Sequence, residues 1–244
     1  MPSENISDIF LDLLPDVVKK AYSENDMETV NLWLQSESKS GNSRAQYVMG
    51  AAYSIGLDRE RNPEKAREYF EKSARKGYAP ALNSLGVIYL NGVDVEPDYE
   101  KAKGYFEKAV SLDNADAMCN LGTMYEDGLA VEQDYGKAYE LYKHAVFNGD
   151  MDAYCNLGVL YEDGKGVEQD YDMAIKMYTK GAKRGDADCM CNLGLLYAEG
   201  RGVARDLKKA AAWYAAAARL GDDEALEELK EYKRQGLLKD TLFN

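Results

Sequence analysis

The sequence predicts an all-α solenoid, a stack of helix–turn–helix units, because glycine, tyrosine and alanine each recur with a period of 36 residues. The glycines are Gly50, Gly86, Gly122, Gly158 and Gly194. The tyrosines are Tyr53, Tyr89, Tyr125, Tyr161 and Tyr197, and the alanines are Ala66, Ala102, Ala138, Ala174 and Ala210. A fixed period of this size is typical of stacked copies of one small unit, so we expect a repeat protein rather than two globular domains.

Each unit is expected to contain two helices. In residues 77–113, apolar and small residues from Ala81 to Tyr89 recur at helical spacing, and Gly92 is placed to end that helix. A second stripe runs from Ala102 to Ala109. The expected N-caps of the first helices are Asn42, Asn114, Asp150, Asp186 and Asp222, and those of the second helices are Asp98, Asp134, Asp170 and Asp206. We interpret the tyrosine stripe as core; the alternative is a row that stacks on a ligand.

The chain is expected to divide into four segments. Residues 1–40 are predicted to form N-terminal capping helices, 41–220 five repeats, and 221–236 a C-terminal capping helix with a polar outer face. The tail, 237–244, is apolar for a chain end, and it either packs on the last unit or serves as a short docking segment.

The repeated pattern resembles the Sel-one-like repeat (SLR), a relative of the tetratricopeptide repeat. The resemblance rests on two units above all, 117–142 and 153–178. In the second unit the matching residues are Ala153, Leu157, Gly158, Tyr161, Gly164, Gly166, Val167, Asp170, Ala174 and Tyr178. The resemblance implies a right-handed α/α superhelix in which the first helix of each unit lines a concave face. It also implies a surface that binds another macromolecule, although a fold alone does not define a function.

Charge limits the class of partner. The formal net charge is -13 and the isoelectric point is about 4.7, which argues against nucleic acids and anionic membrane surfaces and suits a basic protein or peptide. No apolar run is long enough for membrane insertion, and the acidic N-terminus is unlike a secretory signal. We therefore expect a cytoplasmic protein.

The phase of the first helices predicts a partner-binding surface on the concave face. An asparagine precedes the Leu-Gly pair in three successive units, with carboxylates one turn upstream and one turn downstream. The asparagines are Asn120, Asn156 and Asn192; the carboxylates are Asp116, Asp152, Asp188, Glu126, Asp127, Glu162, Asp163 and Glu199. Asparagine can both donate to and accept from a peptide backbone, and carboxylates pair with Lys or Arg. The alternative is that the asparagines cap neighbouring units and the carboxylates are a solvated face.

No catalytic residue, metal ligand or cofactor is predicted. Cys189 and Cys191 would point to two faces of one helix, and the single histidine, His144, does not make a zinc site. The favoured function is a non-enzymatic adaptor or scaffold. One alternative is an inhibitor or immunity protein that sequesters a basic toxin or effector; another is a hydrolase that uses Glu162 and Asp163.

Overall fold

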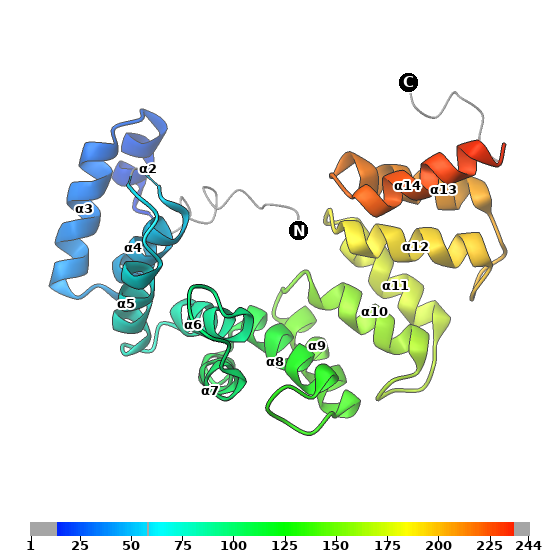
Figure 1. Cartoon of the computed structure of the whole chain (residues 1–244), viewed down its shortest axis with the longest axis horizontal. Coiled ribbons are helices and arrows are strands. Elements are labelled where there is room, and N and C mark those ends of the chain that lie inside the picture. Colours follow the sequence, from blue (N-terminus) through cyan, green and yellow to red (C-terminus); the bar gives the residue numbers. More distant parts are fainter. Residues whose placement is uncertain (1–13, 58, 237–244) are drawn as a thin grey trace. The chain divides into compact units, whose positions relative to one another are not determined.

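The computed structural model describes residues 14–57 and 59–236, and within these ranges every regular element is a helix (Figure 1). The chain divides into two compact units, one ending at Glu132 and one beginning at Gln133. The helices of the N-terminal unit are α2 (Asp16–Ser23), α3 (Met27–Ser40), α4 (Ser43–Ile55), α5 (Pro63–Ala74), α6 (Ala79–Asn91), α7 (Tyr99–Val110) and α8 (Ala115–Asp127). Those of the C-terminal unit are α9 (Tyr135–Phe147), α10 (Ala153–Asp163), α11 (Tyr171–Ala182), α12 (Ala187–Glu199), α13 (Leu207–Arg219) and α14 (Asp223–Arg234).

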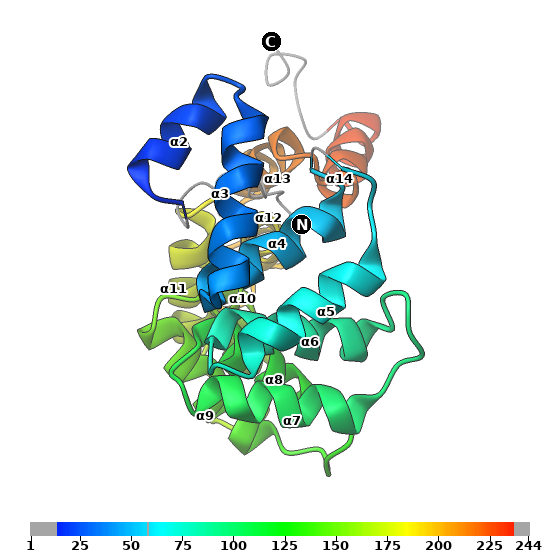
Figure 2. The same cartoon turned by 90° about the vertical axis from the view of Figure 1, so that its left-hand side faces the viewer.

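Consecutive helices pack on one another in each unit, which is the arrangement of an all-α repeat solenoid. The strongest pairs are the two helices of one repeat, such as α4 with α5 and α6 with α7, which Figure 2 shows side by side. The first helices of neighbouring repeats also touch, α6 with α8 and α10 with α12. The predicted fold class is therefore confirmed. The predicted tail, 237–244, lies outside the described residues.

Polar caps define where the helices begin, as predicted. Asp98, Asp134, Asp170 and Asp206 each accept the backbone N–H three residues ahead, at 2.9–3.0 Å. Asn42, Asn114, Asp186 and Asp222 do the same for the first helices. These bonds satisfy donors that a helix start leaves without an internal partner.

One predicted cap differs. Asp150 accepts the Ala153 N–H at 2.7 Å, but α10 begins at Ala153 with Asp152 as its N-cap residue. The preceding turn is closed by bonds between residues three apart, Tyr154 N–H to Met151 and Cys155 N–H to Asp152. The helix therefore starts with a tighter, 3₁₀-type turn, and Asp150 keeps its hydrogen bond from outside the helix.

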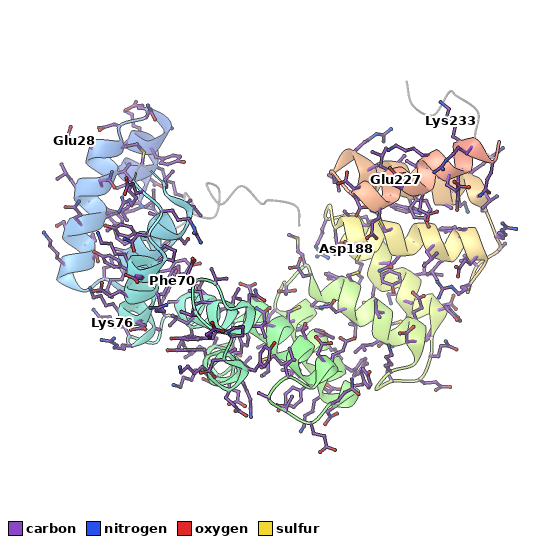
Figure 3. All side chains as sticks on the ribbon, viewed as in Figure 1. Glu28, Phe70, Lys76, Asp188, Glu227 and Lys233 are labelled. Carbon is purple, nitrogen blue, oxygen red and sulfur yellow. The ribbon has the colours of Figure 1, made fainter. Side chains whose placement is uncertain are left out.

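Aromatic side chains of the second helices fill the space between the helices. The interpretation of the periodic tyrosine stripe as core is confirmed only in part, because its five members are half-buried: Tyr53, Tyr89, Tyr125, Tyr161 and Tyr197. Tyr142, Tyr178 and Phe106 are fully buried, and Phe70 packs with Leu85 in a core cluster of the N-terminal unit (Figure 3). Tyr53 packs against this cluster and stacks on Tyr69, with ring centres 5.7 Å apart. No helix in the described ranges combines the length and apolar character needed to cross a bilayer.

Candidate partner-binding face

The predicted residues lie on the first helices of the repeats, and we call the surface that they form in each unit the first-helix face. In the N-terminal unit, Asn120 on α8 donates its side-chain N–H to Oδ1 of Asn83 on α6 at 3.0 Å. On α4, the first helix of the preceding repeat, the Tyr47 side chain lies near Ser84 of α6, and burial raises the pKa of Tyr47. Asn120 therefore joins neighbouring repeats, but it still has an amide oxygen and a second N–H for a partner.

Carboxylates flank this asparagine pair as the sequence predicts. Asp116 and Asp127 are exposed at the two ends of α8, and Glu126 is half-buried. Asp116 lies close enough to Tyr47 for its charge to raise the pKa of that hydroxyl further. The face of the N-terminal unit thus combines amides, a tyrosine and acidic groups within reach of one another.

The C-terminal unit repeats the pattern with sulfur in place of one amide. Asn192 on α12 donates to Sγ of Cys155 on α10 at 3.2 Å, and Asn156 is half-buried beside it on α10. Asp152 and Asp188 are exposed at the starts of the two helices. Figure 3 labels Asp188 at the start of α12.

The carboxylates at the C-terminal ends of α10 and α12 pair with basic side chains of the chain itself. Asp163 pairs with Lys165 at 2.7 Å, and an oxygen of Glu199 lies 2.6 Å from Arg201 Nε. Glu162 is buried, accepts the Tyr178 hydroxyl at 2.7 Å and pairs with Arg201. Glu162 therefore joins α10 to α11 and to the turn after α12, whereas the Asp163 and Glu199 carboxylates remain at the surface.

Two further acidic residues near this face were missed by the sequence analysis. Asp222 and Glu224, at the start of α14, lie near Cys191 together with Asp188. Burial and these three negative charges raise the pKa of Cys191 to about 12. The signal was present in the sequence, since Asp222 follows Asp186 at the repeat period, but we had assigned it only to capping.

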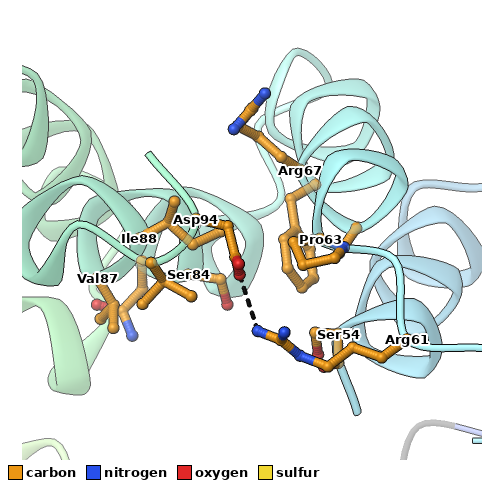
Figure 4. A pocket seen from close by; sticks show the side chains of 12 residues that line it. Ser54, Arg61, Pro63, Arg67, Ser84, Val87, Ile88 and Asp94 are labelled. Carbon is orange, nitrogen blue, oxygen red and sulfur yellow. Dashed lines mark hydrogen bonds and ion pairs between the residues drawn. The ribbon is translucent and has the colours of Figure 1, made fainter. Parts of the chain in front are cut away.

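The N-terminal unit also holds a pocket that no periodic pattern indicated (Figure 4). It has a volume of about 270 Å³ and lies between α5, α6 and the end of α4. Its walls are formed by Ser54, Arg61, Pro63, Ala66, Arg67, Phe70, Asn83, Ser84, Val87, Ile88, Val93 and Asp94. Arg61 pairs with Asp94 at 2.8 Å across it. Because Asn83 both lines the pocket and bonds Asn120, the pocket adjoins the first-helix face.

The chain matches the sequence profile of the Sel1 repeat, the repeat that the sequence analysis called Sel-one-like. The five matched ranges are 43–78, 79–114, 115–146, 152–186 and 187–222. No curated protein sequence matches the chain.

Solved structures agree with this match. A Sel1 repeat protein from Oxalobacter formigenes is similar with a TM-score of 0.81 and 30% identity, over 89% of each chain. A protective antigen of uropathogenic Escherichia coli with an SLR fold gives 0.73 and 32% identity, over 84% of this chain and 44% of that longer one. An immunity protein from Pseudomonas aeruginosa gives 0.55 and 23% identity, over 75% of this chain and 67% of its own, which shows a shared fold.

Proposed function

Because the chain belongs to the Sel1 repeat family, whose members are protein-interaction modules, we propose that it is a non-enzymatic adaptor that binds a basic, extended segment of a partner protein. The observation that carries the proposal is the first-helix face, where asparagine amides and exposed carboxylates alternate in each unit. Amides pair with a peptide backbone through both donor and acceptor, and carboxylates select Lys and Arg side chains.

Exposed carboxylates at equivalent positions of the first helices support the proposal. Asp116, Asp152 and Asp188 stand at equivalent positions of three repeats, and all three are exposed. Within the C-terminal unit, a ligand that runs along α10 and α12 would meet Asp152 and then Asp188. Exposed charge pairs contribute about 0.2–1 kcal/mol each, so several must act together to hold a peptide.

The pocket beside Asn83 supplies an apolar anchor point. Phe70, Val87 and Ile88 contribute its apolar walls, and its volume of about 270 Å³ suits one large apolar side chain. Arg67 lines the same pocket, so the residue that enters it is not basic. The expected ligand therefore carries an apolar residue for this pocket and basic residues for the carboxylates of α8.

The arrangement of Glu162 and Asp163 argues against the hydrolase alternative. General acid–base chemistry needs a carboxyl group that can reach a substrate and exchange a proton with it. Glu162 is buried and bonded to Tyr178 and Arg201, while Asp163 pairs with Lys165. Both carboxylates have structural partners, so neither is placed to exchange a proton with a substrate.

Selection from a displayed library of random 12-residue peptides tests the proposed function. We expect enrichment of peptides with at least two Lys or Arg residues and one large apolar residue, and we expect their binding to weaken as salt rises. Recovery of peptides without basic residues, or binding that ignores salt, would contradict the proposal.

A dedicated inhibitor of a basic toxin or effector is a second candidate, and the net charge of -13 favours it. The shared fold with the P. aeruginosa immunity protein is compatible with this role. The two functions differ in affinity: an inhibitor binds one folded partner with nanomolar strength or better, whereas an adaptor binds short peptides more weakly. Calorimetric titration of any captured partner, as a whole protein and as a peptide, separates them.

A further inference from the structure

A cluster of metal-ligand atoms lies between the fourth and fifth repeats. Sγ of Cys155 on α10, Sγ of Cys189 on α12 and a carboxylate oxygen of Asp186 all lie within 4.8 Å of one another. Cys189 is fully buried, and the other two residues are half-buried. The repeat period does not predict this cluster, because Cys155 and Cys189 occupy different positions of their repeats.

The fold makes room for the Cys189 sulfur in this repeat. Cys189 occupies a first-helix position where the other repeats have alanine: Ala45, Ala81, Ala117, Ala153 and Ala225. Opposite it on α11 stands Gly181, where the other second helices have Ser73, Ala109, Ala145 and Ala217. A Cβ atom at Gly181 would lie only 2.3 Å from Cys189 Sγ. The missing methyl group at Gly181 leaves the space that the Cys189 sulfur fills. It does not explain why the Cys155 sulfur and the Asp186 carboxylate lie beside that sulfur.

The spacing of the three ligand atoms suits zinc. Zn–S bonds of about 2.3 Å at tetrahedral angles place two sulfurs about 3.8 Å apart, and a carboxylate oxygen at about 2.0–2.2 Å from the metal lies about 3.5 Å from each sulfur. The three ligand atoms, all within 4.8 Å of one another, are therefore near the separations that one zinc ion requires.

The surroundings hold these ligands in place. Asp186 caps α12 and accepts the Cys189 N–H at 2.9 Å, so both residues lie at the positive end of the α12 dipole. Asn192 donates to Cys155 Sγ at 3.2 Å, which is the kind of outer contact that orients a metal ligand. A bound ion would displace the thiol protons of both cysteines.

We propose that Cys155, Cys189 and Asp186 bind one zinc ion, which links α10 to α12 within the C-terminal unit. Two thiolates with one carboxylate match the soft-to-borderline preference of zinc rather than the all-oxygen sites of calcium or magnesium. The three protein ligands leave a fourth position, which water fills from the half-exposed Cys155 side. This site adjoins the first-helix face, because Asn192 contacts Cys155, but its proposed zinc binding does not rest on the proposed partner-binding function.

Titration with Co²⁺ in place of zinc tests the site directly. The full chain is reduced with a phosphine, freed of metal by a chelator and titrated while absorption is recorded. We expect one equivalent of Co²⁺ to give thiolate-to-cobalt charge-transfer bands and the visible bands of tetrahedral cobalt, and we expect one equivalent of Zn²⁺ to remove both.

Four variants make the test specific. Cys155→Ser and Cys189→Ala are expected to abolish the charge-transfer bands. Cys189→Ala introduces the alanine that the other repeats have at this position, so we expect it to fold, and circular dichroism verifies this. Asp186→Asn keeps the helix cap and is expected to weaken binding by about tenfold or more, the scale on which supporting groups already affect metal affinity. Cys191→Ser, a half-buried cysteine of the same helix, is the matched control and is expected to bind normally. The proposal is overturned if wild type gives no such bands, if they persist in Cys189→Ala, or if Cys191→Ser loses them.

Discussion

The Tyr178 ring on α11 lies directly against the backbone of Gly158 on α10. A Cβ atom at Gly158 would stand 2.4 Å from Cε1 of Tyr178, closer than real side chains approach. The same contact recurs at Gly86 with Phe106 and at Gly194 with Tyr214. The periodic glycine is thus the place where an aromatic ring of the second helix meets the first.

Gly158→Val is expected to destabilise the protein severely, by about 3 kcal/mol or more, because Tyr178 is fully buried and cannot move aside without strain. Thermal or urea unfolding measures the effect. Gly104→Val on α7 is the matched control, since a Cβ there meets nothing within 4 Å. Equal melting of the two variants would contradict the proposed packing of α10 against α11.

Tyr178→Phe is expected to lower stability at neutral pH and to make stability less sensitive to alkali. The mutation removes a buried hydrogen bond to a carboxylate, worth about 1.5–3 kcal/mol. Burial and Glu162 raise the pKa of Tyr178 above its unfolded value of about 10, so the contribution is complete below pH 10 and is lost as pH rises above it.

Urea unfolding of wild type and Tyr178→Phe at several pH values between 8 and 11 provides the measurement. Above pH 10, wild type should lose up to about 1.4 kcal/mol per pH unit more than the variant. Other tyrosines, among them Tyr161 with a pKa raised to about 12, contribute to both proteins and cancel in the difference. Parallel pH profiles would show that Tyr178 is not held as its contact with Glu162 implies.

The hydrogen bond between Asn83 and Asn120 is expected to couple neighbouring repeats. In a double-mutant cycle with Asn83→Ala and Asn120→Ala, the coupling energy should be about 0.5–1.5 kcal/mol of unfolding free energy. A coupling energy near zero would indicate that this contact contributes nothing to the stack. Asn120 would then have no measurable structural role beside the proposed one in binding.

The repeat period predicts the helices and their caps because each repeat must satisfy the same backbone groups with the same few residue types. Asp113 illustrates how far this extends: it replaces the glycine that follows the second helix in most repeats and still adopts a left-handed backbone, with φ of 59°. The structure shows that the chain keeps this turn at some conformational cost.

The candidate site was less predictable, because helical phase shows which face a residue occupies but not what lies opposite. Glu162 and Asp163 are adjacent in sequence, yet one is buried against Tyr178 and Arg201 and the other is at the surface. Cys155 and Cys189 come together through an offset of 34 residues, two short of the period. The pocket near Asn83 depends on side chains that do not follow the repeat, such as Asp94, where the later repeats have Ala130, Gly166 and Gly202.

Neutralising the first-helix carboxylates tests the central claim most directly. The triple variant Asp116→Asn, Asp152→Asn and Asp188→Asn changes the net charge from -13 to -10 (-13 + 3) and alters three exposed, equivalent positions. The matched control is Glu64→Gln, Glu100→Gln and Asp172→Asn, which makes the same charge change at equivalent, exposed positions of the second helices.

Affinity for a selected basic peptide would be measured by fluorescence anisotropy at one salt concentration, after both variants are shown to melt like wild type. A peptide bound along α10 and α12 would lose two charge contacts of about 0.2–1 kcal/mol each, so we predict about twofold to thirtyfold lower affinity in the first-helix variant and little change in the control. Equal affinity in the two variants would contradict the assignment of the first-helix face as the binding surface.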